Sequence, residues 1–440
     1  MSRLERTVGI YTLGCKVNQY ESEAIAEGLA SRGFLVVPFS QICDAYIINT
    51  CTVTAESDRK ARQLIRRAIK NNPLAYIIVT GCMAEVFSDK LSKIEGIDYI
   101  CGNGNKLQVI NALEDLFEQG QKNAFPKISL SPLDEFEAMQ ITHFDRTRAY
   151  VKIEDGCENR CTYCIIPEAR GKVRSKDSED VVCEVRALTA GGCREIVLTG
   201  IETASYGRDF NNGYRLADLL EEVDAIPNIG RIRLGSLDPS LMKNDFVNRI
   251  AKLKSLTPHF HLSMQSGSDK ILALMKRKYN SKIALEGMER LRAAIPGVQF
   301  TTDMIVGFPG ETEEDFALTV DFAKKAKFLM IHVFPYSERR GTVAATLPQR
   351  VPEEIRHRRV RELSEVQAKI QKEVLDSYTN TAVEVLFETY ANGIMTGHTD
   401  TFVEVACPVF HSLQAQLHTV YITGNDGKKC IGTLCPHANG

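Results

Sequence analysis

Residues 155–175 read DGCENRCTYCIIPEARGKVRS. Three cysteines, Cys157, Cys161 and Cys164, fall within eight residues of this stretch, and no fourth cysteine is nearby in the sequence. A closed zinc or iron–sulfur site normally has four protein ligands, so three ligands leave one coordination position open for a substrate or cofactor. The C-x3-C-x2-C spacing favours a four-iron cluster, because the turns between ligands must wrap around a cube. The alternatives are a zinc site completed by a distant ligand and three unconnected thiols.

The cysteine stretch follows the strand-like run AYVKI (149–153). Six consecutive βα units favour an incomplete parallel barrel over a flat sheet, because successive right-handed crossovers curl in the same direction. The cysteines follow the first strand, at the carboxyl rim where barrel enzymes build their active sites. The five further strand-like runs, separated by helical patterns, are at 194–199, 231–236, 259–264, 299–307 and 328–334.

A separate α/β series precedes the cysteine stretch. Apolar runs at 8–13, 45–50 and 75–80 alternate with amphipathic segments at 19–31 and 54–70. The order βαβαβ predicts a parallel sheet.

Each of these three strands is followed by a cysteine. Cys15 and Cys82 come after a strand and one glycine, and Cys51 follows its strand directly. The carboxyl ends of parallel strands lie along one edge of a sheet, so we expect the three thiols to converge in a second three-cysteine metal site. Simple packing of small apolar cysteines is the alternative. Cys43 and Cys101 do not share this placement, and we expect them in the core.

The tail of the chain changes character after a long helix that begins near Pro352. The short β-like runs TAVEVLFE, FVEVAC and HTVYIT predict a small β-barrel. We therefore expect an α/β protein with an N-terminal parallel-sheet domain at 3–118, a linker at 119–142, a partial (β/α)6 barrel at 143–373 and a β-barrel domain at 376–440.

Composition bounds the class of protein. The chain has 440 residues, of which 44% are hydrophobic and 25% charged, with a formal net charge of −2. The N-terminus MSRLERTVG lacks the apolar run of a signal peptide, and no apolar segment reaches the roughly 20 residues that span a bilayer. We therefore expect a cytoplasmic protein that does not bind membranes. Thirteen cysteines in such a reducing compartment indicate metal ligands and core residues rather than disulfides.

The stretch GCENRCTYCIIPEARG resembles the cluster loop of radical S-adenosylmethionine (SAM) enzymes. Together with TLGCKVNQYES, INTCTVT and VTGC, it is similar to the tRNA methylthiotransferases, and the β-rich tail matches their RNA-binding TRAM domain in position and character. LGCKVNQYES and HVFPYSERRGTVAA look most like the MtaB branch, which acts on N6-threonylcarbamoyladenosine (t6A) next to the anticodon. The resemblance covers essentially the whole chain and implies conversion of t6A to 2-methylthio-t6A.

The resemblance also implies the cofactors. Cys157, Cys161 and Cys164 would hold a [4Fe–4S] cluster whose fourth iron chelates SAM. Reductive cleavage of SAM would supply the radical needed to attack an unactivated adenine C2–H bond. A second, auxiliary [4Fe–4S] cluster on Cys15, Cys51 and Cys82 would present sulfur, and we expect the two clusters to face one another across the domain interface.

Further residues are candidates for contact with SAM. Tyr163 lies between the last two cysteines, and a glycine-rich turn before the second barrel strand would admit the methionine amino group. Helix or strand-end capping and a tight βα loop are the alternatives for most of these positions. The candidates are Tyr163, Gly191, Gly192, Gln265, Ser266 and Gly307.

Clusters of basic residues suggest how RNA would be held. Arginines and lysines crowd the stretch after the cysteine loop, the segment 54–70 and residues 339–361. Such runs are often only solvated faces, but together with a β-barrel tail they suggest a surface that tracks phosphates. We expect Arg170, Arg174, Arg356 and Arg359 to contact the anticodon stem-loop of tRNA. We also expect a reductase or flavodoxin-type electron donor and a monomeric chain.

Other functions stay open at this point. The same radical chemistry could act on isopentenyladenosine (the MiaB branch) or on a ribosomal protein (the RimO branch). A noncatalytic iron–sulfur RNA-binding protein is the alternative from a different class. His259 and His261 alternate on one predicted strand, and we expect them to pack or hydrogen-bond rather than bind a metal.

Overall fold

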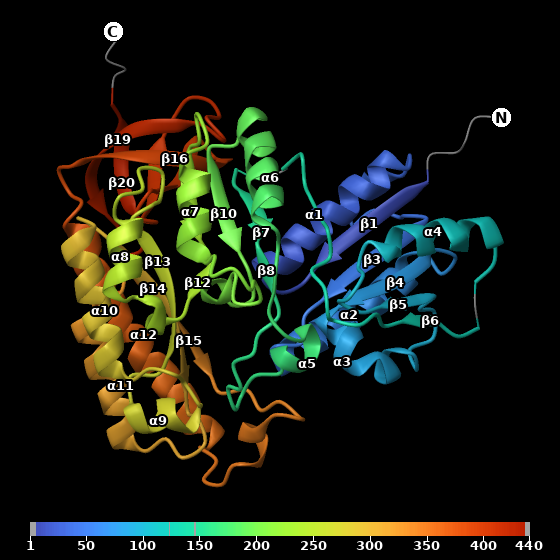
Figure 1. Cartoon of the computed structure of the whole chain (residues 1–440), viewed down its shortest axis with the longest axis horizontal. Coiled ribbons are helices and arrows are strands. Elements are labelled where there is room, and N and C mark those ends of the chain that lie inside the picture. The colour runs from blue at the N-terminus through green and yellow to red at the C-terminus, as the bar shows by residue number, and fades with distance from the viewer. Residues whose placement is uncertain (1–5, 123, 145–146, 436–440) are drawn as a thin grey trace.

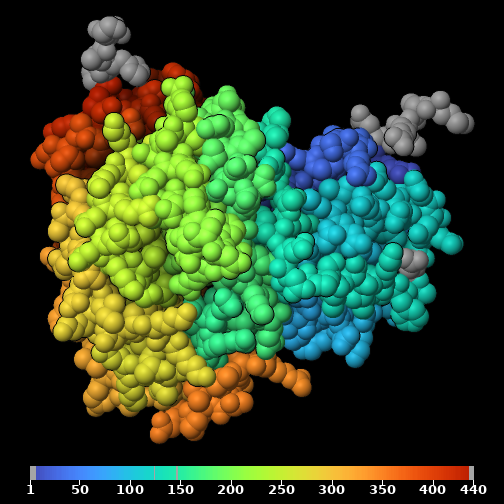
Figure 2. Space-filling model, in the orientation of Figure 1, coloured from blue at the N-terminus to red at the C-terminus, as the bar shows by residue number. Residues whose placement is uncertain are grey.

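The computed structural model describes residues 6–122, 124–144 and 147–435. Its chain forms an N-terminal sheet domain, a central curved sheet and a small C-terminal barrel (Figure 1). The N-terminal domain packs along one side of the central part, so the two present a continuous surface in Figure 2.

The N-terminal domain is a six-stranded parallel sheet with helices on both faces. Its central strands are buried along their whole length because apolar clusters cover both faces. Cys43 and Cys101 belong to these clusters, as expected. The strand order is β2 (Leu35–Val37), β1 (Thr7–Thr12), β3 (Ala45–Thr50), β4 (Tyr76–Gly81), β5 (Tyr99–Cys101) and β6 (Lys127–Ser129). The helices are α1 (Lys16–Ser31), α2 (Ala55–Asn71), α3 (Cys82–Leu91) and α4 (Gln108–Gln119).

The segment predicted as a linker is partly structured. Residues 127–129 add β6 in parallel to β5, so the N-terminal sheet extends into the range 119–142. Further along the segment, Met139 and Ile141 are buried in the core of the central domain. Two prolines and weak periodicity are typical of a linker, so the sequence did not predict these contacts.

The central domain has the predicted parallel strands in two adjoining sheets. One sheet has the order β11-β10-β7 and the other has the order β12-β13-β14-β15. The third predicted strand divides at Gly235 and contributes to both sheets, which makes the curved surface continuous. The strands are β7 (Ala149–Lys152), β10 (Glu195–Thr199), β11 (Arg231–Leu234), β12 (Ser236–Leu237), β13 (His259–Gln265), β14 (Gln299–Val306) and β15 (Met330–Pro335).

Helices cover the outside of this curved sheet and enclose the largest apolar cluster of the molecule. A short antiparallel pair, β8 (Glu154–Asp155) with β9 (Arg174–Ser175), closes the base of the cysteine loop, which also contains α5 (Ile166–Arg170). The covering helices are α6 (Ser178–Ala190), α7 (Leu216–Asp224), α8 (Asn244–Ile250), α9 (Asp269–Leu274), α10 (Ser281–Ala294), α11 (Glu313–Ala326) and α12 (Glu353–Asp376).

The C-terminal segment is a closed five-stranded barrel, which confirms the prediction of a small β domain. Its interior is an apolar cluster that includes Val385, Phe387 and Val405. The barrel order is β16 (Ala382–Ala391), β17 (Ile394–Thr399), β18 (Glu404–Pro408), β20 (Cys430–Leu434) and β19 (Leu417–Asn425). Closure leaves no unpaired strand edge in this domain.

Candidate active site

The first cysteine triad lies at the carboxyl ends of three neighbouring strands of the N-terminal sheet. Cys15 is the N-cap residue of α1 after β1, Cys51 directly follows β3, and Cys82 begins α3 after β4. Electrostatic interactions join Cys82 to both Cys15 and Cys51. The structure therefore brings together the three thiols that the strand order predicted.

A glycine allows the turn after β1 to pass close to this triad. Gly14 has a φ of +107°, and a Cβ at this position would lie 2.9 Å from the Cβ and 3.2 Å from the Sγ of Cys51. Any larger residue would be strained and would collide with the cysteine. The turn after β1 thus needs a glycine in order to pass this close to Cys51.

The second triad lies on the loop between β8 and β9. The amide of Cys157 donates to the carbonyl of Gly171 at 3.0 Å, and the amide of Thr162 donates to the carbonyl of Met275 at 3.2 Å. Electrostatic interactions join Cys164 to both Cys157 and Cys161. The loop is therefore fixed by backbone hydrogen bonds with its three thiols in one region.

Burial opposes loss of the proton from four of these thiols in the metal-free chain. It raises the pKa of Cys15, raises the pKa of Cys51 and Cys157 to about 12, and raises that of Cys164 to about 11. Metal binding requires thiolates, so bound iron must displace these protons.

An arginine donates to one sulfur of each triad. Nε of Arg170 lies 3.4 Å from Sγ of Cys82, and Nη1 of Arg277 lies 3.1 Å from Sγ of Cys161. Arg170 belongs to the cysteine loop of the central domain, whereas Cys82 belongs to the N-terminal domain. Cys82 also interacts electrostatically with Cys164 of the second triad. The two triads therefore lie near one another across the domain interface.

The donor sets fit two iron–sulfur clusters better than two single ions. Within the described ranges, no three Cys, His, Asp or Glu side chains converge as ligands of one metal ion. The thiolates of a four-iron cluster each bind a different iron, so they surround a volume instead of meeting at a point. Two sets of three soft thiols and the arginine donors to sulfur are compatible with such clusters.

A cavity of about 280 Å³ adjoins the second triad. Tyr163, Cys164, Gln265, Ile305 and Tyr336 are among its lining residues. Gln265 has a φ of +66°, which turns the end of β13 at the cavity wall. Two of the predicted SAM contacts, Tyr163 and Gln265, thus face a space beside the cysteine loop.

The other four predicted SAM contacts do not line this cavity. Gly191 and Gly192 end α6 at the amino end of β10, the edge of the sheet opposite the cysteine loop. Their backbone amides donate to Ala187 and Thr189, so they act as a helix cap.

Ser266 and Gly307 also have structural roles. Ser266 is fully buried, and its hydroxyl bonds to that of Thr319. The amide of Gly307 donates to Glu311, and a Cβ on Gly307 would lie 2.2 Å from Cγ of Arg356. Neither residue is among the described residues that line the cavity beside Cys164.

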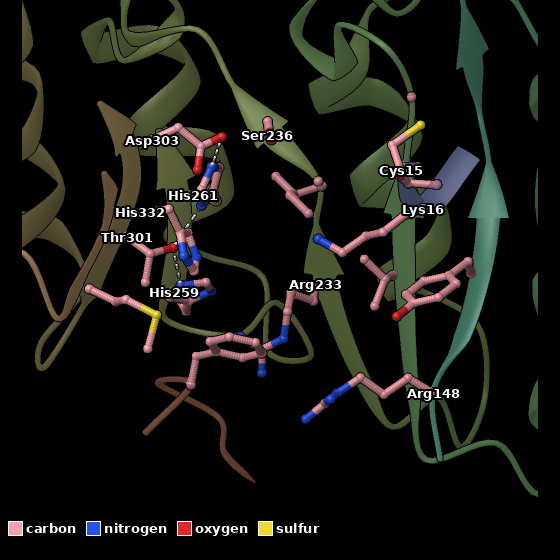
Figure 3. Close-up of a pocket in the computed structure, with 18 residues that line it drawn as sticks. Cys15, Lys16, Arg148, Arg233, Ser236, His259, His261, Thr301, Asp303 and His332 are labelled. Atoms are coloured by element: carbon pink, nitrogen blue, oxygen red, sulfur yellow. Dashed lines mark hydrogen bonds and ion pairs between the residues drawn. The ribbon is translucent and has the colours of Figure 1, made fainter. Parts of the chain in front are cut away.

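A second cavity, of about 500 Å³, connects the first triad to the inner face of the central sheet (Figure 3). Its wall includes Cys15, and Asp303 lines both this cavity and the one beside Cys164. The two triads thus adjoin two neighbouring cavities. The polar lining residues include Lys16, Arg148, Arg233, Ser236, His259, His261, Thr301, Asp303 and His332.

The histidines of this cavity are hydrogen-bonded, as expected. Nε2 of His259 and Nδ1 of His261 each lie 3.0 Å from the hydroxyl of Thr301, and Nε2 of His261 lies 3.4 Å from Asp303. Burial holds the pKa of His259 well below its usual range, so its ring is neutral. The sequence did not predict that Lys16, Arg233 and Asp303 line a cavity. Two arginines alternating in the buried strand RIRL (231–234) were a signal of a buried polar site.

Comparison with known proteins identifies the family. A model of the radical SAM superfamily matches residues 151–323, and the model described as "Uncharacterized protein family UPF0004" matches residues 7–102. Threonylcarbamoyladenosine tRNA methylthiotransferase MtaB of Bacillus subtilis (strain 168) is 40% identical over 407 residues, which cover 91% of this chain and 90% of that protein. This chain belongs to the radical SAM tRNA methylthiotransferase family.

Other relatives agree with this assignment. The MtaB protein of Aquifex aeolicus (strain VF5) is 38% identical over 83% of this methylthiotransferase and 89% of its own length. The tRNA-2-methylthio-N(6)-dimethylallyladenosine synthase of Carboxydothermus hydrogenoformans is 37% identical, covering 87% of this chain and 88% of that protein. The radical SAM methyltransferase TsrM of Kitasatospora setae, solved with cobalamin and a [4Fe–4S] cluster, has a TM-score of 0.55 at 15% identity, over 78% of this chain and 74% of that one. That likeness shows a shared fold.

Family membership makes this methylthiotransferase a tRNA-modifying enzyme that uses SAM and [4Fe–4S] chemistry. Within the part of the chain that the structure describes, every helix is too short or too polar to cross a bilayer.

The arginines predicted to bind RNA have other roles in this methylthiotransferase. Arg170 is fully buried, and Arg174 is buried and donates to the carbonyls of Leu133 and Arg170. Arg359 is buried against Glu311 and Glu313.

Arg356 is half-buried and donates to the carbonyl of Tyr336 at 2.6 Å. The prediction was therefore wrong for the three buried arginines, because their partners come from distant parts of the sequence. Exposed cations lie instead on α2, where Arg66, Arg67 and Lys70 face solvent.

Proposed function

We propose that this methylthiotransferase acts on t6A next to the anticodon of tRNA and adds a methylthio group at C2 with two [4Fe–4S] clusters. The observation that carries the proposal is the placement of two three-cysteine sets near one another, each beside one of two adjoining cavities. Relatives at 36–40% identity named for t6A support the choice of substrate.

In this proposal, Cys157, Cys161 and Cys164 hold the cluster that binds SAM, and Cys15, Cys51 and Cys82 hold the auxiliary cluster. When bound, these groups supply the radical and sulfur chemistry that side chains lack. The chain's own residues place them: Arg170 and Arg277 donate to sulfur, and Tyr163 and Gln265 line the cavity for SAM. Water is restricted because the cavities lie between packed domains.

The remaining parts of the proposal concern partners. The enzyme works in the cytoplasm as a monomer and receives electrons from a reductase or flavodoxin-type protein. The exposed cations of α2 contribute to contact with the tRNA phosphates, since phosphate binding relies on accessible Lys and Arg side chains.

Nucleoside analysis tests the substrate. A strain that lacks this gene is expected to lose 2-methylthio-t6A and accumulate t6A, because the C2 of adenine has no other route to the modification in this proposal. Mass spectrometry of digested tRNA measures both nucleosides.

Complementation with the wild-type gene should restore the modified nucleoside, and complementation with Cys51→Ala should not. If 2-methylthio-t6A persists and the 2-methylthio derivative of isopentenyladenosine disappears, the enzyme belongs to the dimethylallyladenosine branch and the t6A proposal is wrong.

A further inference from the structure

The larger cavity has two chemically different walls. Lys16 and Arg233 lie on one side, and His261, Asp303 and His332 lie on the other (Figure 3). Lys16, Arg148 and Arg233 are the basic side chains among the described lining residues apart from the histidines, and Asp303 is the acidic one. The predominance of basic side chains on the wall favours an anionic ligand.

Lys16 extends from the amino end of α1 into this cavity (Figure 3). Among the described residues, its ammonium group has neither a hydrogen-bond acceptor nor an ion-pair partner. The side chain is exposed, and the surface that it exposes lies within the cavity next to Cys15. An ammonium group carries three donors, so Lys16 is available to an oxygen acceptor of a ligand.

Arg233 is held rigidly but not fully satisfied. Its Nε and Nη2 donate to the carboxylate of Glu195 at 2.8 and 3.2 Å, and its guanidinium lies 4.8 Å from the ring centre of Phe402. Nη1 is buried without an acceptor, and only about 4% of the side chain is exposed. A buried donor without an acceptor is costly, so its position on a cavity wall indicates a group that arrives with the ligand.

Glu195 fixes the arginines of this wall in place. Burial opposes its ionisation, but Arg233 and Arg148 lower the pKa of Glu195 to about 2, so it is an anion at neutral pH. Arg231 also approaches Glu195. Glu388 pairs with Arg148 at 2.6 Å, so carboxylates balance the arginines of this wall. Lys16 and the Nη1 group of Arg233 stay without an acceptor among the described residues.

We propose that Lys16 and Arg233 form a carboxylate-binding subsite that recognises the anionic side chain of the modified adenosine. This inference rests on the proposed function, since t6A carries a threonyl carboxylate and isopentenyladenosine carries an uncharged branched hydrocarbon. The cavity volume of about 500 Å³ lies within the range of roughly 300–1,000 Å³ that small-molecule sites occupy. A hydrocarbon in this cavity would leave Lys16 and the Nη1 group of Arg233 without an acceptor, so the wall also disfavours it.

Binding of short RNA by the cluster-loaded enzyme, measured by fluorescence anisotropy without SAM, tests the subsite. The probes are one anticodon stem-loop with t6A, with the methyl ester of t6A, or with unmodified adenosine. The wild-type enzyme is expected to bind the t6A stem-loop roughly 10- to 100-fold more tightly than the ester. This is the loss of affinity expected when one or two charge-assisted hydrogen bonds to the carboxylate are removed. Lys16→Met is expected to remove this preference while leaving affinity for the unmodified stem-loop unchanged.

Two variants control for indirect effects. Lys16→Arg keeps the charge and is expected to retain the preference, whereas Lys282→Met removes an exposed charge on α10 and should change nothing. Iron content of each variant shows whether the neighbouring Cys15 is still a ligand. The proposed subsite is wrong if the Lys16→Met enzyme has full iron content and still prefers t6A over its ester.

Turnover of t6A and isopentenyladenosine stem-loops by the wild-type enzyme distinguishes failure of the subsite from failure of the proposed function. If wild type methylthiolates t6A but Lys16→Met discriminates normally, only the subsite fails. If wild type acts on isopentenyladenosine and ignores t6A, the proposed function and the subsite both fail.

Discussion

Changing Cys161 to alanine is expected to abolish SAM cleavage, whereas changing Cys51 to alanine is expected to abolish methylthio transfer and leave SAM cleavage intact. The two cysteines belong to different triads, and each triad has a separate task in the proposed function. We expect each lost activity to fall by more than roughly a thousandfold, because the residues of a catalytic unit act together. Chromatographic measurement of 5′-deoxyadenosine and of the modified nucleoside distinguishes the two variants.

Cys183 provides the control for this comparison. It is exposed on α6, away from both triads, so Cys183→Ala should retain both activities. Loss of SAM cleavage in Cys51→Ala with the Cys161 cluster still present would contradict the division of labour between the triads.

Changing Arg170 to methionine is expected to lower the free energy of unfolding by about 3–5 kcal/mol, because it leaves buried carboxylates without their partner. Arg170 Nη1 lies 2.6 Å from Glu21 and 3.0 Å from Asp155, and Nη2 lies 2.6 Å from Asn18. Glu21 lies on α1 of the N-terminal domain and Asp155 on β8 of the central domain. Urea unfolding of the metal-free chain, followed by circular dichroism, measures the change.

The matched control is Arg160→Met. Arg160 is exposed in the same cysteine loop, so its replacement should change the free energy of unfolding by less than about 0.5 kcal/mol. Lys106 and Lys152 also form ion pairs with Glu21, so they compensate part of the stability lost when Arg170 is replaced. A stability of Arg170→Met equal to that of the control would mean that the buried network does not hold the two domains together.

The strands and the placement of the first triad could be predicted because they depend on local periodicity. Parallel strands buried on both faces give continuous apolar runs, and a cysteine just after such a run must lie at the carboxyl edge of the sheet. The closed C-terminal barrel followed in the same way from short β-like runs. Local periodicity did not predict the break at Gly235. A single predicted strand divides there, and its two parts belong to different sheets.

The roles of charged residues could not be predicted, because their partners are remote in sequence. Arg170 belongs to a basic run that is typical of a solvated or RNA-binding face, yet Glu21 and Asn18 from the N-terminal domain bury it. Lys16 was read only as part of a family motif, and its position on a cavity wall depends on the approach of two domains. Gly191 precedes a strand and so lies at the amino edge of the sheet, whereas the cysteine loop follows a strand at the carboxyl edge.

The count of clusters in anaerobically reconstituted protein tests the central claim most directly. Iron and sulfide analysis with Mössbauer spectroscopy should find about eight irons per wild-type chain in two four-iron clusters, and about four irons in either Cys161→Ala or Cys51→Ala. A wild-type chain with one four-iron cluster, or with a single metal ion held entirely by side chains, would contradict the account.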